Sequence, residues 1–404
     1  KVKTTLNSQS CDRRRWETLG VDASLAENAN KVGDAYVDLG CDSTSFTCAP
    51  YLLPSAPRRG EQIIWGESNA VVYSNSVLGA RTEKYADYFD ICSAIVGCVP
   101  NVGVHVEENR APTIVIDATN LIRDHLLPRT RRDNGGKTRN DDSSLLEESS
   151  RIDSFFPAMG WVCGNLSDGG IPLVLGFDTL PLVSNDNLKA FCAAFGTTGA
   201  APLFHMARIT PEAIEDDVVR KMAVACCEKR VEVTKEDLCE AYNTLDSGND
   251  DGNDDVSLVA LGNPHLSVEE LGQLSNLIDH DDRPKHDDVR IIATLGRHIQ
   301  SKGDELGYTK RLESFGVQFI NDTCWCMLLD PPIIPSNPEA RILTNSGKYA
   351  HYGPGLTSRR IRFGSTWDCI EAAKSGKMKP AHGSVPQWLR SFSTQVIRSL
   401  KNIK

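Results

Sequence analysis

The chain has 404 residues, of which 40% are apolar and 24% charged, and its formal net charge is −10 at pH 7. This balance is typical of a folded globular protein. Because proteins bind nucleic-acid phosphates through basic surfaces, the acidic balance argues against a nucleic-acid partner. The best membrane candidate, residues 170–183, is interrupted by Pro172, Asp178 and Pro181, and it is shorter than the roughly 18 to 20 apolar residues that a membrane span needs. We therefore expect no membrane partner either.

The chain begins at Lys1 in a polar stretch, and residues 1–6 are predicted to form a strand. We therefore expect no signal peptide and a missing N-terminal portion. The thirteen cysteines are too few for a disulfide scaffold in a chain of this length. Several of them, such as Cys192 and Cys226, lie in apolar runs, where a thiol behaves as a small apolar side chain. This usage predicts a reducing compartment, the cytoplasm or the mitochondrion, and a few cysteines as ligands.

In chain order, short apolar runs alternate with helical patterns. The runs predict strands at 113–117, 171–176, 201–206, 256–261, 289–295, 317–320 and 341–343. Helices are predicted at 185–195 and 366–375, with one helix opening at 210 (Thr-Pro-Glu) and another at Ser267, which forms a capping box with Glu270. This alternation predicts an α/β fold with mostly parallel sheets.

Two stretches have the composition of surface insertions. Residues 128–152 are rich in charge, Gly and Ser, and residues 244–255 form an acidic, low-complexity run. The second stretch contains Asp-x-Asp spacing, but it lacks the final Glu of a calcium-binding EF-hand loop. We interpret both stretches as solvated loops.

Chemically capable side chains follow four predicted strands, and in open α/β sheets ligands bind at the carboxyl ends of strands. The four sets are His205 with Arg208, His265, Cys324 with Cys326, and Asn345, Ser346, Lys348 and His351. Each set also has a structural interpretation. A lone histidine is more often hydrogen-bonded in a core, Cys-x-Cys is too tight for a zinc motif, and residues 345–348 lack the upstream glycine of a phosphate loop.

A polar stretch at residues 67–82 ends in Arg81, and an arginine binds a carboxylate through two parallel hydrogen bonds. A second histidine and arginine follow at His105 and Arg110. These residues are therefore candidates for binding an anionic substrate.

Seven blocks, which occur in the same order over nearly the whole chain, resemble the catalytic large-subunit region of the aconitase X family. They are residues 47–52 (Thr-Cys-Ala-Pro-Tyr-Leu), 68–82, 103–110, 203–212, 260–267, 322–324 and 344–355. The resemblance implies that residues 1–404 are a catalytic region with an aconitase-like, multi-layer α/β fold that lacks the small swivelling domain. That domain or subunit would be the partner, and the chain would be truncated at its N-terminus.

The resemblance further implies an iron–sulfur hydro-lyase that removes water from a small hydroxy acid. The family acts on cis-3-hydroxy-L-proline, giving pyrroline-2-carboxylate, or on mevalonate 5-phosphate. The acidic chain and hydrophilic insertions favour hydroxyproline, because a phosphomonoester calls for at least two cationic groups. Iron polarises the departing hydroxyl, and thiolates hold iron–sulfur clusters.

The implied site is assigned by role. Cys48, Cys324 and Cys326 are the expected ligands of a 2Fe–2S or 4Fe–4S cluster. Arg81, Ser346, Lys348 and His205 are the expected catalytic residues, and by superfamily analogy the proton-abstracting serine comes from the swivelling domain. The expected substrate-binding residues are Asn75, Ser76, His105, Asn345 and His265.

One departure from the family pattern leaves two alternatives open. Many relatives have Cys directly after Pro-His, where this chain has Leu266. An inactive or regulatory homologue with an incomplete cluster is therefore one alternative. The other is a metal-free isomerase, or another α/β enzyme, that uses His205, His265 and Lys348.

Overall fold

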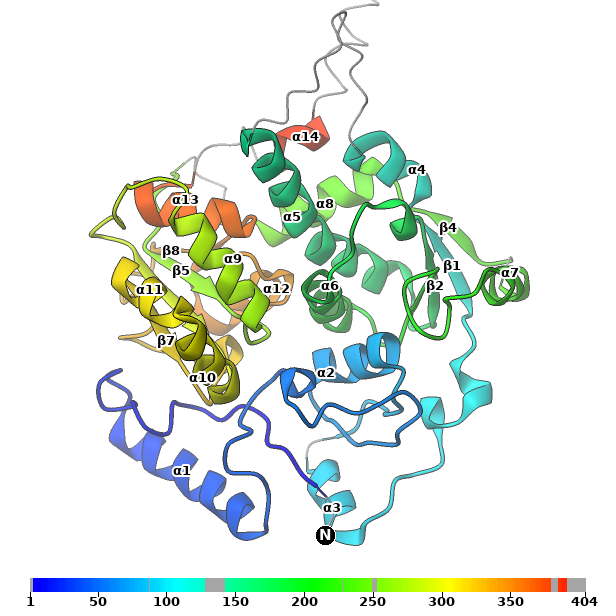
Figure 1. Ribbon diagram of the computed structural model, residues 1–404, viewed down its shortest axis with the longest axis horizontal. Helices are drawn as coiled ribbons and strands as arrows, with labels where there is room; N and C mark the ends of the chain where they lie inside the picture. The colour runs from blue at the N-terminus through cyan, green and yellow to red at the C-terminus, as the bar shows by residue number, and fades with distance from the viewer. Residues whose placement is uncertain are drawn as a thin grey trace, which may run out of the picture.

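The computed structural model describes residues 3–86, 88–127, 142–226, 228–248, 253–378 and 384–390. Two α/β units, each built on its own parallel sheet, lie side by side with the helices α5 (Asp142–Leu166) and α6 (Asn185–Thr198) between them (Figure 1). The α/β fold class with parallel sheets that the sequence predicts is therefore confirmed.

The first sheet has the strand order β3-β2-β1-β4. Its strands are β1 (Ile114–Asp117), β2 (Pro172–Leu175), β3 (His205–Met206) and β4 (Arg230–Glu232). All pairs are parallel, with Ile114 opposite Pro172 and Leu173 opposite His205. The strand predicted at 201–206 is thus much shorter than expected.

The second sheet has the order β7-β6-β5-β8-β9, again with parallel pairing throughout. Its strands are β5 (Leu258–Leu261), β6 (Arg290–Thr294), β7 (Val317–Ile320), β8 (Arg341–Thr344) and β9 (Arg360–Phe363). The chain runs outward from β5 to β7 and then returns to the other side of β5 at β8. Loops that leave such a switch point separate and open a crevice at the carboxyl ends of the strands.

The other helices lie around the two sheets (Figure 1). They are α1 (Ala23–Asp38), α2 (Ser68–Tyr73), α3 (Phe89–Val96), α4 (Thr119–Leu121), α7 (Asp216–Ala225), α8 (Lys235–Leu245), α9 (Val268–Ile278), α10 (Arg297–Leu306), α11 (Tyr308–Phe315), α12 (Gly347–Thr357), α13 (Thr366–Ser375) and α14 (Gln387–Arg390). Among the described residues, no helix combines the length and apolarity that a membrane crossing requires.

One large apolar core joins the two units. It includes Ile116 of the first sheet, Ile292 of the second, and Phe156 and Phe191 on the helices between them. A Cβ on Gly160 would lie 2.3 Å from the carbonyl oxygen of Phe191, so only glycine allows α5 and α6 to approach this closely. The crevice at the second sheet therefore has one wall from each unit.

Several predicted elements are placed as expected. The strand at 317–320 and the helix at 366–375 have the predicted bounds, and Ser267 caps α9 together with Glu270. The helix predicted to open at 210 is wrong, because Thr210 Oγ1 instead accepts the backbone N–H of Met206 and closes a turn. The next helix, α7, begins at Asp216. Residues 3–5 form no strand, and Leu6 makes one isolated bridge, with Phe46.

The predicted surface insertions are wrong at their ends. Helix α5 begins at Asp142, and its Ile152 packs against the core. Helix α8 extends to Leu245, and the following Asp246 is buried against Arg362 with 2.6 Å between carboxylate oxygen and Nε. Residues 128–141 and 249–252 lie outside the described residues.

Candidate functional site

Three thiols lie together where the loop after β7 meets the first part of the chain. The Cys324 thiol makes hydrogen bonds with those of Cys48 and Cys326. Cys48 lies two residues before the short helix at Pro50–Leu52, and Cys324 directly precedes the one at Trp325–Met327. The hydrogen bond with Cys326 lowers the pKa of Cys324, but the hydrogen bond with Cys48 and burial raise it to about 12. The three predicted ligands are therefore brought to one place.

A buried ion pair stands beside the thiols. Lys348, in the first turn of α12, contacts the carboxylate of Glu67, the residue before α2. Burial would raise the pKa of Glu67, but the Lys348 ammonium lowers it. Burial would likewise lower the pKa of Lys348, whereas Glu67 and the three thiols raise it. The site therefore keeps one positive and one negative charge next to its sulfur atoms.

His265 lies between the loops that carry Cys48 and Cys324. Its ring nitrogens contact Thr47 Oγ1 at 2.8 Å and the Thr323 carbonyl oxygen at 2.7 Å. The ring is completely buried, and burial lowers its pKa to about 4. Both ring nitrogens are thus used within the protein, and the substrate-binding role of His265 stays a prediction.

Three buried polar atoms around the thiols have no hydrogen-bond partner among the described residues: Asn263 Oδ1, Thr323 Oγ1 and Tyr349 Oη. The amide nitrogen of Asn263 lies 3.6 Å from the sulfur of Cys326. Buried polar atoms are nearly always paired, so each unpaired one calls for an explanation.

Gly262 turns the chain before Asn263 with a φ of +88°, and a Cβ there would lie 2.2 Å from the Thr294 carbonyl oxygen.

A cavity of about 410 Å³ opens beside this group, with Asn7, Thr47, Gln62 and Glu67 among its lining residues. Part of its other wall comes from Ser93 and neighbouring residues of the exposed helix α3. The cavity is large enough for a small organic acid. Glu67 brings a carboxylate to its wall.

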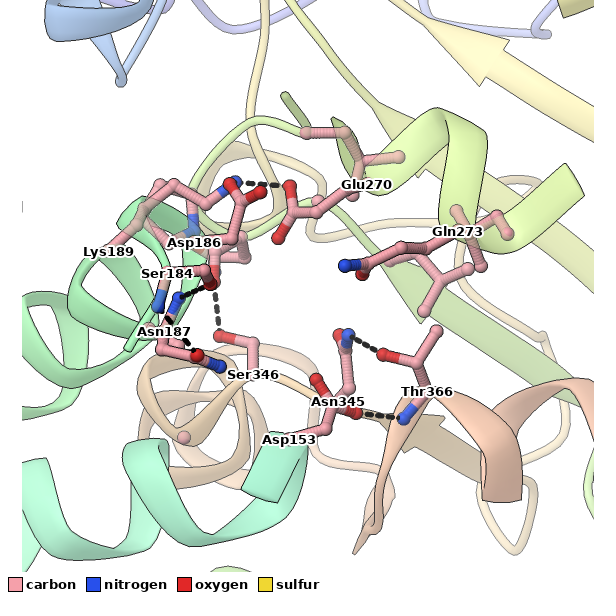
Figure 2. Close-up of a pocket in the computed structure, with 18 residues that line it drawn as sticks. Asp153, Ser184, Asp186, Asn187, Lys189, Glu270, Gln273, Asn345, Ser346 and Thr366 are labelled. Carbon is pink, nitrogen blue, oxygen red and sulfur yellow. Dashed lines mark hydrogen bonds and ion pairs between the residues drawn. The ribbon is translucent and has the colours of Figure 1, made fainter. Parts of the chain in front are cut away.

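A smaller polar cavity of about 50 Å³ lies between α6 and the carboxyl ends of β5, β8 and β9. Figure 2 shows Glu270 and Asn345 on opposite sides of it, with Lys189 bonded to Glu270. Asn345 Nδ2 donates to Thr366 Oγ1 at 2.9 Å. Ser346 caps α12, accepts the Tyr349 N–H at 3.1 Å, and donates to the Asn263 carbonyl oxygen. Ser346 therefore has a structural role as the cap of α12, and its catalytic role stays a prediction.

Asn75, Ser76 and His205 belong to a separate buried network. The Asn75 amide bonds the carbonyl oxygens of Thr82 and Pro202, and its oxygen accepts from Arg110. His205 Nε2 donates to the Arg110 carbonyl oxygen at 2.7 Å, and Ser76 accepts the backbone N–H of Phe204. The polar groups of these three residues therefore hold the first unit together, and their substrate-binding and catalytic roles stay predictions.

Arg81 and His105 form a third group, which reaches the larger cavity through Gln62. Arg81 pairs with Glu107 and also donates to the His105 carbonyl oxygen at 3.3 Å. His105 Nδ1 contacts Gln62, a residue that lines the cavity, while its Nε2 has no partner among the described residues. Burial lowers the pKa of His105. The structure therefore connects Arg81 to the cavity through Gln62 and does not place it against the thiols.

Sequence reasoning missed Glu67, Thr47 and Asn263. Thr47 and Asn263 lie within two positions of residues that it did select, Cys48 and His265, and Glu67 opens the polar stretch 67–82. These three residues belong to no sequence motif of their own, so nothing in the sequence singled them out.

Family models match three consecutive parts of the chain: the aconitase X first domain at residues 1–108, the second at 136–243 and the third at 256–375. The large subunit of phosphomevalonate dehydratase from Methanocaldococcus jannaschii is 31% identical over 92% of this chain and 82% of its own length. The chain belongs to the aconitase X family. The thiol site is formed by residues of the first and third aconitase X domains.

Two other aconitase X relatives are more similar in sequence. Proteins named cis-3-hydroxy-L-proline dehydratase from Hypocrea jecorina and Pseudomonas aeruginosa are 44% and 41% identical over 92% and 96% of this chain. The chain covers 57% and 60% of their lengths, which is less than two thirds. A crystal structure of Thermococcus kodakaraensis aconitase X in its holo-form superimposes with a TM-score of 0.68 at 27% identity, over 93% of this chain and 81% of that one.

Proposed function

We propose that this chain is the catalytic part of a hydro-lyase that removes water from cis-3-hydroxy-L-proline to give pyrroline-2-carboxylate. The observation that carries the proposal is the meeting of Cys48, Cys324 and Cys326 beside a cavity. The two relatives named for this substrate share more of the sequence than the phosphomevalonate dehydratase subunit does. Since the chain spans about three fifths of those relatives, we further propose a small domain or subunit as its partner.

The residues present fit an iron–sulfur cluster. Thiolates are the usual ligands of such clusters, and the oxygens of Asn263, Thr323 and Tyr349 have no hydrogen-bond partner among the described residues, which supports a further group in this pocket. Among the described residues, no group of three or more His, Cys, Asp and Glu side chains is arranged to hold a metal ion. The three thiols would hold a cluster, because the thiolate ligands of a cluster need not all bind a single metal ion. When bound, the cluster supplies a Lewis acid that polarises the departing hydroxyl.

The chain's own residues have separate tasks in this proposal. Each thiol must lose its proton before it can bind metal, and the Lys348 ammonium favours that loss because it stabilises the negative sulfur atoms. Glu67, whose pKa is lowered, presents an ionised carboxylate at the cavity wall, where it can hold the ring nitrogen of the substrate. Arg81 would bind the substrate carboxylate after release from Glu107.

Mevalonate 5-phosphate is the second candidate substrate, and one feature favours it. A second cavity, of about 400 Å³, has Lys3, Arg14, Arg297 and His298 among its lining residues and shares Lys3 and Ser55 with the larger cavity. A phosphomonoester needs cationic groups of this kind. However, Arg297 is already paired with Asp12 and Asp322.

The third candidate is an inactive homologue. Leu266, which stands where many relatives have cysteine, is buried in the core of the second unit. It therefore supplies no thiol in place of that cysteine. A reducing compartment is also proposed, since described cysteines such as Cys48, Cys163 and Cys192 are free thiols.

The test is anaerobic purification of the complete gene product, followed by iron and sulfide analysis and by assays with both substrates. We expect iron and sulfide in the wild type, and loss of both in Cys48→Ala and Cys324→Ala. Cys163→Ala, at a cysteine buried in the core, is the matched control. Turnover of mevalonate 5-phosphate alone would overturn the choice of substrate. Iron content that is unchanged in both ligand variants would overturn the cluster assignment.

A further inference from the structure

Every polar group of His265 is used, and each contact reaches a different part of the site. The ring joins Thr47 on one side and Thr323 on the other. The backbone N–H donates to the sulfur of Cys48 at 3.4 Å, and the carbonyl oxygen accepts from Lys189 Nζ at 3.1 Å. One buried residue therefore connects both cysteine loops and the helix α6 of the other unit.

The contacts determine the protonation of the ring. A carbonyl oxygen can only accept, so Nε2 carries the hydrogen and donates it to Thr323. In the neutral ring, Nδ1 is then the acceptor for the hydroxyl hydrogen of Thr47. The oxygen of Thr47 is left free to accept the backbone N–H of Ala49, at 3.0 Å. A continuous chain of hydrogen bonds thus runs from Ala49, past Cys48, to the residue before Cys324.

Lys189 secures the far side of His265. It is buried and also contacts the carboxylates of Glu270 and Asp186. Glu270 is in turn fixed as part of the capping box of α9, because it accepts the Ser267 N–H at 2.8 Å. His265 is therefore held in place by the adjacent unit and not only by the loops that it joins.

We propose that His265 is a positioning residue that sets the separation of Cys48 and Cys324, acting through Thr47 and Thr323, so that the two sulfurs can bind one cluster. This inference rests on the proposed function of the thiol site. Groups that orient metal ligands commonly change metal affinity by about 10- to 100-fold when they are replaced. His265 touches no substrate in this proposal, so its replacement should act on the cluster first.

The test compares Thr47→Val, which has nearly the same shape but no hydroxyl, with Thr47→Ser, which keeps the hydroxyl. His265→Asn places an amide near the position of Nδ1, and His265→Gln places one near the position of Nε2, so each variant can restore the hydrogen bond on one side of the imidazole. The matched control is His205→Gln, since His205 is equally buried and also donates to a backbone carbonyl, but far from the thiols in the fold. Circular dichroism establishes that each variant is folded.

The first readout is the rate at which a chelator removes iron from the anaerobically reconstituted, complete protein, followed by visible absorbance. We expect removal about tenfold or more faster in Thr47→Val and His265→Asn. Thr47→Ser and His205→Gln should match the wild type, and His265→Gln should lie between. Equal rates of iron removal in Thr47→Val and Thr47→Ser would overturn the proposal, even if the His265 variants fail to fold.

The second readout separates this inference from the proposed function. In metal-free protein, the rate at which a soluble aromatic disulfide modifies Cys48 and Cys324 reports how firmly their loops are held. Thr47→Val should increase this rate and Thr47→Ser should not. If the wild type takes up no iron or sulfide, the proposed cofactor fails while this comparison still decides the role of His265. If the wild type takes up both and all variants behave alike, only the inference fails.

Discussion

Replacing one member of the Lys348–Glu67 pair gives the sharpest test of the electrostatics at the thiol site. Lys348 is 6% exposed, and the Glu67 side chain is 20% exposed. Removing one partner of a buried pair leaves the other charge uncompensated, which costs about 3 to 5 kcal/mol. Because Glu67 retains some exposure, we expect the low end for Lys348→Met, about 3 kcal/mol. Glu67→Gln keeps an oxygen for Lys348 and should cost less, about 2 kcal/mol.

The double variant Glu67→Gln/Lys348→Met removes both charges and should return to within about 1 kcal/mol of the wild type. The assay is urea unfolding at neutral pH, followed by far-ultraviolet circular dichroism, on metal-free protein. Arg220→Met is the control, because its pair with Asp217 is 75% and 85% exposed and should contribute nothing measurable. A Lys348→Met protein as stable as the wild type, or a double variant that loses the sum of the two single losses, would refute the reasoning.

Three further predictions concern other parts of the molecule. Cys326→Ala should lower the iron content of reconstituted protein while Cys239→Ala does not; equal iron in the two variants, measured after gel filtration, would remove Cys326 from the ligands. Burial lowers the pKa of His205. As the pH falls, the unfolded chain therefore takes up a proton at this residue at a higher pH than the folded protein does. The stability that His205 contributes is thus present above about pH 6.5 and is lost as the pH falls below that value. His205→Gln should therefore weaken the decline in the free energy of unfolding between about pH 7 and pH 5, and an unchanged slope in urea titrations would contradict this. Asp246→Ala leaves the Arg362 charge buried and should destabilise the protein by about 3 kcal/mol or more; a loss no larger than that of an exposed aspartate variant would mean that the pair is solvated.

Sequence patterns were most informative where local and tertiary requirements agree. The strand at 317–320 and the helix at 366–375 combine an apolar pattern with clear boundaries, and the Ser267 capping box is a local hydrogen-bond arrangement. Strands β4 and β9 were not predicted, because their sequences Arg-Val-Glu and Arg-Ile-Arg-Phe alternate with charge. Arg362 occupies a buried strand position only because Asp246, distant in sequence, compensates it. No local pattern contains that information.

The residues of the candidate site also differ in how well the sequence indicated their roles. Thiol chemistry and loop position indicated Cys48, Cys324 and Cys326, and the fold brings their sulfurs together. The roles of the histidines were harder to assign, because the sequence does not distinguish an imidazole that binds a ligand from one that is hydrogen-bonded to a backbone carbonyl. His205 and His265 both proved to be bonded to backbone carbonyl oxygens, in different units. Only their surroundings distinguish a structural position from one beside the thiols.

The meeting of Cys48 with Cys324 also bears on how the protein matures. These residues come from opposite ends of the chain, so their contact closes one of its longest loops and raises the contact order of the fold. Such contacts form late, because the entropy of closing a long loop must be overcome first. In a nascent chain, the thiol site cannot form until the third domain has been synthesised and has packed against the first. Under the proposed function, metal delivery would therefore follow folding, and slow docking would leave the thiols open to oxidation in the meantime.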